Sequence, residues 1–403
     1  MSLVQLPPAE RSLSRVAAIV GVGETDYGAD YKAAREKREG YAPPTPETLA
    51  KLAFERALAD SGLEREAIDG LSVSFLYGGP EPAEMAQILG IQPRYQVEAF
   101  GLMAGPLPQA VAAIAAGKAD TIALVYAVAT RSVGRKFGGV NFDDDSGAPQ
   151  SYSYFHPWGW SSQAAHWALA WQHYRHQYNR GADELGAIAM AMRQHAQAHP
   201  LAVMQAPMSP ETYAAARWIV KPLRLFDMCL VNDGGVCIIL RRADLARGME
   251  HDPVAVAGWG EAVVTADSLD MLVRQRLGPQ FRAAGDMALG MAGLELGQVG
   301  HFEAYDASTM HLLSHVEGHG FVAPGTGLEL ICDGGIGPTG QLPINLGGGM
   351  LSGSYMHGWS HLAEIVRQLR REAGDRQVPD LEVSMFSLAQ TNMVHPLVLT
   401  RGI

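Results

Sequence analysis

The sequence predicts an α/β protein built from two long, duplicated units. Residues 19–24 (IVGVGE) return as 256–261 (VAGWGE), and residues 57–64 (ALADSGLE) return as 288–295 (ALGMAGLE), at nearly the same offset. A third pair of segments follows in the same order. A solenoid would need many short repeats. Two long copies instead indicate related halves with helices packed between or around sheets, and chance similarity is the competing interpretation.

The elements of each unit are expected in a fixed order. The first repeat predicts a strand ending in a glycine turn. The second predicts a helix that ends at Gly62 or Gly293 and leads into a strand. These strands are expected at 71–75 and about 302–305. The third repeat predicts a glycine-containing turn, a helix and a buried strand. In the first half these are the turn at 101–105, a helix to about 116 and a strand at 121–127. In the second half they are the turn at 347–349, a helix at about 357–371 and a strand at 381–387.

An insertion at roughly 131–222 has no counterpart in the second half, so we expect an N-terminal half at 1–250 and a C-terminal half at 251–403. Four aromatic residues share one face of a predicted helix in it, namely Trp167, Trp171, Tyr174 and Tyr178. Others precede that helix: Tyr152, Tyr154, Phe155, His156, Trp158 and Trp160. The stripe either packs on the body or a second subunit, or lines a pocket for a bulky apolar ligand.

Composition excludes several classes of function. The chain has 403 residues, of which 47% are hydrophobic and 18% charged. Its 31 basic and 42 acidic residues leave a formal charge of −11, which does not suit a nucleic-acid backbone or an anionic membrane surface. No segment reaches the ~20 apolar residues of a membrane span, and residues 1–15 lack the apolar stretch of a signal peptide. We expect a cytoplasmic protein that binds no nucleic acid.

The usual cofactor and metal motifs do not occur. Gly21-x-Gly23 follows a predicted strand, but Asp26 replaces the third glycine of a dinucleotide fingerprint. Phosphate-loop, zincin and hydrolase-elbow motifs are absent. The three cysteines form neither a C-x-x-C pair nor a run of metal ligands; they are Cys229, Cys237 and Cys332. We therefore expect no bound cofactor and no metal ion.

Two segments of the second half carry the residues suited to chemistry. Residues 303–308 (EAYDAS) follow a predicted strand, and residues 345–358 (NLGGGMLSGSYMHG) open a predicted helix. Both can bring side chains to one edge of a sheet, where α/β proteins bind ligands. Glycines allow a ligand to approach the backbone, and unpaired N–H groups at a helix start stabilise an oxyanion. The alternative is that the glycines only make a tight connection and Tyr355 packs.

The sequence resembles the thiolase superfamily, specifically the sterol-carrier and lipid-transfer-like thiolases. The matching segments span nearly the whole chain: VGVGETDYG, PETLAKLAFERALADSGL, AAIAAGKADTIALV, PLRLFDMCLVNDGG, EAYDAST and NLGGGMLSGSYMHG. The resemblance implies a thiolase fold, with two duplicated βαβαβαββ halves in a five-layer αβαβα arrangement and an inserted loop domain.

The family's catalytic residues are replaced in this chain. Thiolases use a nucleophilic cysteine at a helix start, but residues 99–105 read AFGLMAG. Tyr305 and Tyr355 stand where thiolases have histidines, and the C-terminal cysteine is missing from 390–395 (QTNMVH). Thiolytic cleavage needs a thiolate to hold the acyl group. Ordinary thiolase chemistry is therefore not expected.

The tyrosine pattern resembles that of the steroid side-chain aldolases, which cleave a β-hydroxyacyl-CoA by a retro-aldol step without a covalent enzyme intermediate. The resemblance implies a coenzyme A thioester as substrate and a shorter acyl-CoA plus a ketone or aldehyde as products. The expected acid/base candidates are Tyr355, then Tyr305, with His357 relaying protons or positioning Tyr355. The expected substrate-binding residues are Asp306, Asn345, Gly348, Gly349, Gly101 and Met103.

The same resemblance implies partners. It suggests a homodimer, with the strand at 121–127 as a candidate dimer element, and a small partner protein with an OB-like barrel and a zinc ribbon. Three histidines recur every four residues after EAYDAST, namely His311, His315 and His319. We expect them to face solvent or a pocket edge rather than to bind a metal ion.

Two other functions remain open. The missing cysteine is also consistent with a non-catalytic thiolase-like subunit that carries acyl-CoA for another protein. The third hypothesis is an acyltransferase or thiolase with an unconventional nucleophile. Cys229 and Cys237 lie before and within a predicted strand rather than at the required helix start, which is typical of core cysteines.

Overall fold

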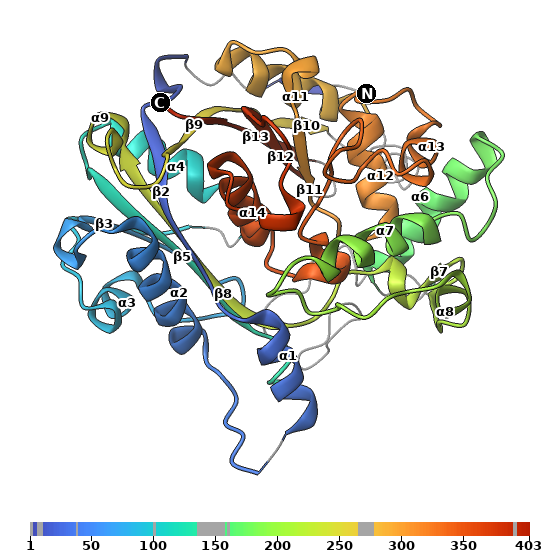
Figure 1. Ribbon diagram of the computed structural model, residues 1–403, viewed down its shortest axis with the longest axis horizontal. Helices are drawn as coiled ribbons and strands as arrows, with labels where there is room; N and C mark the ends of the chain where they lie inside the picture. Colours follow the sequence, from blue (N-terminus) through green and yellow to red (C-terminus); the bar gives the residue numbers. More distant parts are fainter. Residues whose placement is uncertain are drawn as a thin grey trace.

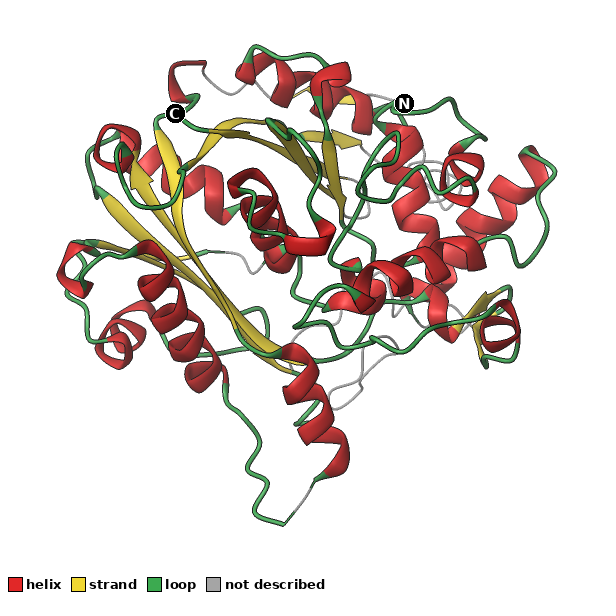
Figure 2. Cartoon of the chain, viewed as in Figure 1, coloured by secondary structure: helices red, strands yellow, loops and turns green. Residues whose placement is uncertain are grey.

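A computed structural model describes residues 3–5, 11–37, 39–99, 102–134, 158, 162–264, 278–389 and 393–403. Its strands form one continuous sheet of eleven strands over these residues, bent into two halves (Figures 1 and 2). The first half has the order β2 (Ala17–Glu24), β8 (Asp233–Arg242), β5 (Thr121–Ala129), β3 (Gly70–Ser74) and β4 (Tyr95–Glu98). The second has β9 (Val254–Trp259), β13 (Met393–Arg401), β12 (Val383–Ala389) and β11 (His301–Ala304).

The two halves match strand by strand. In the first, β2, β8 and β5 pair antiparallel and β3 joins β5 in parallel. In the second, β9, β13 and β12 pair antiparallel and β11 joins β12 in parallel. The halves meet where β2 pairs with β9, and β10 (Ala262–Val264) and β1 (Leu3–Gln5) extend the second half along β13. This confirms the duplication that the sequence predicts.

Helices cover both outer faces and fill the space between the halves (Figure 1). The central layer holds α4 (Pro106–Ala115) and α14 (Trp359–Arg370), whose apolar residues share one buried cluster with strands of both halves. The outer layers hold α2 (Pro46–Ser61) and α3 (Pro82–Leu89) on one side, and α11 (Gln280–Ala292) and α12 (Thr309–Gly318) on the other. The layers are αβαβα, as expected.

Strand β5 shows why the sheet is covered on both faces. Ile122 and Leu124 join the cluster of the central helices, while Ala123 and Val125 join the cluster under α2. Side chains of a strand alternate between faces, so a strand with only apolar residues needs apolar layers on both sides. The strand begins at 121 as predicted and runs two residues beyond the predicted end.

The repeated glycines bring a helix against a strand in each half. A Cβ on Gly23 of β2 would lie 2.0 Å from the carbonyl oxygen of Ala53 in α2. A Cβ on Gly258 of β9 would lie 2.2 Å from the carbonyl oxygen of Ala288 in α11. Only glycine permits such a close approach of two backbones. The glycines of the repeated segments therefore serve helix–strand packing rather than dinucleotide binding.

The insertion contributes helices beside the second half (Figure 1). These are α6 (Gln163–Gln177), α7 (Gly186–Gln197) and α8 (Pro210–Ala214), with a small hairpin of β6 (Trp218–Val220) and β7 (Leu223–Arg224). Trp171 and Tyr174 are buried, and the Tyr174 hydroxyl donates to Glu317 of α12 at 2.6 Å. For this helix the packing interpretation is confirmed. Trp158 is exposed, and the other aromatic residues before α6 lie outside the described residues.

The other α-helices of the described residues are α1 (Tyr27–Glu36), α9 (Ala243–Ala246) and α13 (Gly327–Cys332). The second glycine motif forms a π-helical turn, Gly349–Gly353, and α14 starts only at Trp359. Most other expected boundaries agree within about two residues. In the described part of the chain, no helix combines the length and apolar character needed to traverse a bilayer.

A role of β5 in a dimer stays a prediction, but the strand pairs with β8 on one side and β3 on the other, so its backbone groups are not available at a sheet edge. One sequence-based expectation is wrong. The three histidines of α12 are buried rather than exposed, with 3%, 0% and 1% exposure for His311, His315 and His319. A four-residue spacing places side chains on one face of a helix but does not say which face is buried. Here α6 and α11 cover that face.

Candidate active site

Tyr305 and Tyr355 come from two segments that the fold brings together. Tyr305 directly follows β11, and its N–H donates to the Ser387 carbonyl of β12 at 2.9 Å. Tyr355 lies just beyond the π-helical turn, and its N–H donates to Asn232 Oδ1 at 2.7 Å. Each tyrosine is 8% exposed, and the two phenols lie close enough for each to shift the pKa of the other. The fold thus makes neighbours of the two residues singled out in the sequence.

Burial sets the charge of this pair. It raises the pKa of both phenols above the ordinary value of 10. For Tyr305, the neighbouring Tyr355 hydroxyl lowers the pKa in part, whereas for Tyr355 the neighbouring Tyr305 and Cys229 raise the pKa further. The low-dielectric surroundings disfavour a phenolate. Both hydroxyls therefore carry their protons at neutral pH.

His357 packs against this pair as a neutral ring. Its centroid lies 4.3 Å from that of Tyr355, and its Nδ1 is hydrogen-bonded to the Tyr126 hydroxyl of β5. Burial lowers the pKa of His357 to about 3 and raises that of Tyr126. Because Tyr126 stays protonated, it donates to Nδ1, and Nε2 of His357 carries the proton. The carbonyl of His357 accepts from the N–H of Met103 at 3.3 Å.

Gly101, the companion of Met103 in the expected binding set, lies outside the described residues. Met103 itself is fully buried among the apolar residues around α4 and α14. Its N–H group is already engaged by His357. A contact of Met103 with substrate therefore stays a prediction.

Several N–H groups of the glycine turn are hydrogen-bonded within the chain. The Asp306 carboxylate accepts from the N–H of Met350 at 2.7 Å and of Leu351 at 3.3 Å. A Cβ on Gly349 would lie 2.2 Å from Asp306 Oδ2, and one on Gly348 would lie 2.6 Å from Ala196 of α7. The expectation that these N–H groups are unpaired is wrong for Met350 and Leu351, because the Asp306 carboxylate reaches them from the adjacent strand end. A substrate-binding role for these glycines and Asp306 stays a prediction.

Asn345, at the start of the same turn, also bonds to the chain. Its Oδ1 accepts from the N–H of Ala304 at 2.7 Å, and its Nδ2 donates to the Ala304 carbonyl at 2.9 Å. It is fully buried, with φ of +47°. The amide therefore joins the turn to the end of β11, and its contact with substrate stays a prediction.

The structure adds residues that sequence reasoning missed. Glu303 and His361 are buried, and His361 Nδ1 lies 2.5 Å from Glu303 Oε2. Asn232 holds the backbone of Tyr355, and it was visible in the sequence only as part of PLRLFDMCLVNDGG. His361 gave no signal, because histidine occurs both at the surface and in the interior of proteins, so its residue type alone does not predict burial.

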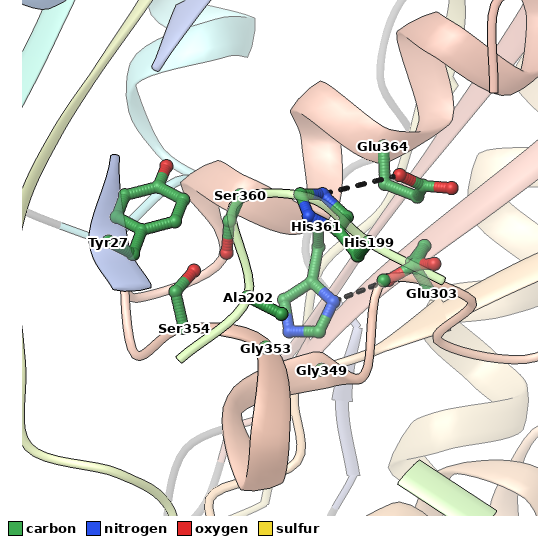
Figure 3. Close-up of a pocket in the computed structure, with 11 residues that line it drawn as sticks. Tyr27, His199, Ala202, Glu303, Gly349, Gly353, Ser354, Ser360, His361 and Glu364 are labelled. Atoms are coloured by element: carbon green, nitrogen blue, oxygen red, sulfur yellow. Dashed lines mark hydrogen bonds and ion pairs between the residues drawn. The ribbon is translucent and has the colours of Figure 1, made fainter. Parts of the chain in front are cut away.

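Two hollows lie near these elements. A small polar cavity of about 20 Å³, enough for one water molecule, is lined by Glu303, Glu364, His199 and His361, together with Tyr27, two serines and backbone of the glycine turn (Figure 3). A groove of about 750 Å³ runs between α1 and residues 200–205. Neither lining includes Tyr305 or Tyr355. Over the described residues, no cluster of three or more histidine, cysteine or acidic side chains is arranged to hold a metal ion.

Two of the three cysteines lack the character of nucleophiles. All three are free. Burial raises the pKa of Cys229 to about 12, and the nearby Asp306 contributes to that rise. Cys237, within β8, is fully buried and its pKa is raised by the same cause. Thiolates are the nucleophilic form, so these two thiols are unreactive at neutral pH.

The duplicated halves and the αβαβα layers define a protein of the thiolase class. The family model described as thiolase C-terminal domain-like matches residues 270–395. The solved structure of the Ltp2-ChsH2(DUF35) aldolase superposes with a TM-score of 0.82 at 28% identity, covering 96% of this chain and 98% of that one. Human mitochondrial 3-ketoacyl-CoA thiolase in complex with CoA superposes at 0.69 over 96% of this chain and 98% of that one, with 14% identity, which shows the shared fold alone.

Two named relatives indicate the branch of the thiolase superfamily to which the chain belongs. The steroid side-chain-cleaving aldolase of Thermomonospora curvata is 31% identical, over 89% of this chain and 91% of the relative. The 17-hydroxy-3-oxo-4-pregnene-20-carboxyl-CoA lyase of Mycobacterium tuberculosis is 33% identical, over 89% and 92%. The chain belongs to the steroid side-chain-cleaving aldolase branch of the thiolase superfamily.

Proposed function

We propose that this protein is an aldolase-type lyase that cleaves the Cα–Cβ bond of a bulky β-hydroxyacyl-CoA of the steroid side-chain type. The products are a shorter acyl-CoA and a ketone or aldehyde. The observation that carries the proposal is the pair of neighbouring, buried tyrosines, Tyr305 and Tyr355. The two relatives that are 31% and 33% identical over most of the chain support it, since one is named an aldolase and the other an acyl-CoA lyase.

The neutral pair suits a proton relay that never forms a free phenolate. In one concerted step, the proton of the substrate β-hydroxyl passes to the Tyr355 oxygen, the proton of Tyr355 passes to the Tyr305 oxygen, and Tyr305 gives its own proton to the α-carbon. The Cα–Cβ bond breaks in the same step: the electrons of the β-O–H bond form the product carbonyl, and the electrons of the broken bond, developing as a thioester enolate, take the proton from Tyr305. Each tyrosine ends with one proton, and rotation of the hydroxyls restores the starting arrangement. General acid–base catalysis of this kind contributes about 10²- to 10⁴-fold.

Phenylalanine variants test this mechanism. Tyr355→Phe and Tyr305→Phe are each expected to lower kcat for release of the shorter acyl-CoA by at least about 10²-fold, because each interrupts the relay. Tyr178→Phe is the matched control, since it removes a hydroxyl just after α6 whose bonded partner is Gln177. Full activity of Tyr355→Phe would remove that residue from the mechanism. Acyl-CoA binding without turnover by the unsubstituted protein, with its partner supplied, would favour the carrier-subunit hypothesis.

The proposal includes two partners. A homodimer is expected to use β4, which pairs with β3 on one side and alternates half-buried and exposed residues. Sedimentation should then give about twice the 43.2 kDa mass of one chain.

A small OB-fold and zinc-ribbon protein is the expected second partner, supported by the DUF35 component that accompanies Ltp2 in the superposed aldolase. Co-purification with the product of a neighbouring gene tests that association.

The remaining parts of the proposal concern organisation and location. The halves are assigned to 1–250 and 251–403, with the inserted region at about 131–222. The three free cysteines are consistent with a reducing, cytoplasmic location, which cell fractionation tests. No cofactor is assigned to this chain beyond the coenzyme A carried by its substrate.

A further inference from the structure

The separation of the two catalytic tyrosines depends on a carboxylate between their segments. Asp306 directly follows Tyr305, and its oxygens accept from two N–H groups of the turn that leads into Tyr355. The Asp306 side chain is fully buried. Gly349 permits this contact, because any side chain there would collide with the carboxylate. A movement of Asp306 relative to the turn would therefore change the distance between the phenols.

His361 holds Asp306 from the other side. It lies in the first turn of α14, where its Nε2 is 3.3 Å from Asp306 Oδ1 and its Nδ1 is 2.5 Å from Glu303 Oε2. Figure 3 shows His361 and Glu303 facing each other beside the small polar cavity. Both side chains are at most 2% exposed. The imidazolium thus bridges two buried carboxylates on the segment that carries Tyr305.

The second carboxylate completes the connection between the three segments. Glu303 Oε1 accepts from the N–H of Leu346, in the glycine turn, at 3.2 Å, and lies 3.1 Å from His301 Nε2. The end of β11, the turn and α14 are therefore joined through charged groups in a low-dielectric interior. Charge-assisted hydrogen bonds are shorter and stronger than neutral ones, so this arrangement tolerates little displacement.

We infer that Asp306 and His361 are positioning residues for carbon–carbon cleavage: they fix the distance between the Tyr305 and Tyr355 hydroxyls and so the rate of proton transfer between them. The inference rests on the proposed function. It assigns Asp306 to the geometry of the catalytic pair instead of to substrate contact. Misplacement of reacting groups by about 1 Å can cost about 10²-fold in rate.

Two substitutions test the inference from opposite sides of the contact. Asp306→Asn keeps the shape of the side chain but replaces one acceptor oxygen by a donor, and His361→Gln removes the cation. Both are expected to lower kcat by about 10- to 100-fold and to leave KM within about twofold. Glu317→Gln is the matched control, because Glu317 is a buried carboxylate that accepts from Tyr174 and from the loop after α12. It is expected to lose stability but to keep its kcat.

A double-mutant cycle separates positioning from a general structural effect. If Asp306 acts through the tyrosine pair, Asp306→Asn should cause little further loss of kcat in a Tyr355→Phe background. An equal loss in both backgrounds would overturn the inference. So would a kcat within about twofold of the unsubstituted enzyme for folded Asp306→Asn or His361→Gln. Tyr355→Phe alone tests the proposed function, so the two failures are distinguishable.

Discussion

The charge on His361 should make stability depend on pH in a way that one substitution removes. Burial by itself lowers the pKa of this histidine, but the hydrogen bonds and charges of Asp306 and Glu303 outweigh burial and raise it from 6.5 to about 9. In the unfolded chain the imidazole has lost these carboxylates. The folded protein therefore binds a proton more tightly than the unfolded chain does.

The magnitude follows from the two pKa values. A difference between 6.5 and about 9 corresponds to about 3 kcal/mol of stability, and His361 is too deeply buried for solvent to screen it. A group whose pKa is raised by folding contributes fully below its unfolded pKa. This contribution should therefore be complete below about pH 6.5, decline between pH 6.5 and 9, and vanish above that range.

Urea unfolding of the unsubstituted protein and of His361→Gln between about pH 6.0 and 9.5 measures this effect. The difference in unfolding free energy between the two should shrink by about 3 kcal/mol across the range. His251→Gln serves as the control, since His251 forms a half-exposed pair with Glu372, which is worth at most about 1 kcal/mol. A difference that stays constant with pH would refute the assignment of a charged His361.

Three further outcomes are expected from the packing. Gly258→Ala should lower the free energy of unfolding by at least about 1–3 kcal/mol, because the added methyl group meets the backbone of α11 at 2.2 Å. Gly297→Ala is the control: the added carbon has open space around it, so the free energy of unfolding in the same urea titration should change by less than about 0.5 kcal/mol. Arg376→Met should cost about 3–5 kcal/mol by leaving Glu364 buried without its ion pair at 2.9 Å, and calorimetry should show the lower Tm. Iodoacetamide should modify Cys332 in the native protein and spare the other two thiols; equal labelling of all three by peptide mass spectrometry would contradict this.

The charges around Glu364 illustrate how the fold handles buried acids. Burial raises the pKa of this carboxyl, but Arg376 and His199 outweigh burial and lower the pKa to about 2. Its neighbour across the small cavity, Glu303, is likewise stabilised in its charged form by two histidines despite burial. Glu303 meets the charged His361, which lies 58 residues further along the chain. Such a match is invisible to local sequence patterns.

Local patterns predicted the elements well where their signal was periodic. The apolar run at 121–127 became β5, and the helix ending at Gly62 became α2, with Gly62 in the left-handed conformation at its C-terminus. The turn at 345–358 was predicted less well. It was expected to open a helix with free N–H groups, yet it forms a π-helical turn in which two amides bond to Asp306. That outcome depends on a carboxylate far away along the chain.

By itself, the sequence determined the duplication, the order of strands and helices in each half, and the replacement of catalytic cysteine and histidines by other residues. These features can be predicted because they depend on the spacing of nearby residues and on the type of side chain. Tertiary structure alone decided that the phenols of residues 305 and 355 are neighbours, that Asp306 bridges their segments, and that the histidines of α12 face inward. Contacts of this kind depend on which surfaces meet when the layers pack, and desolvation at those contacts sets which groups are charged.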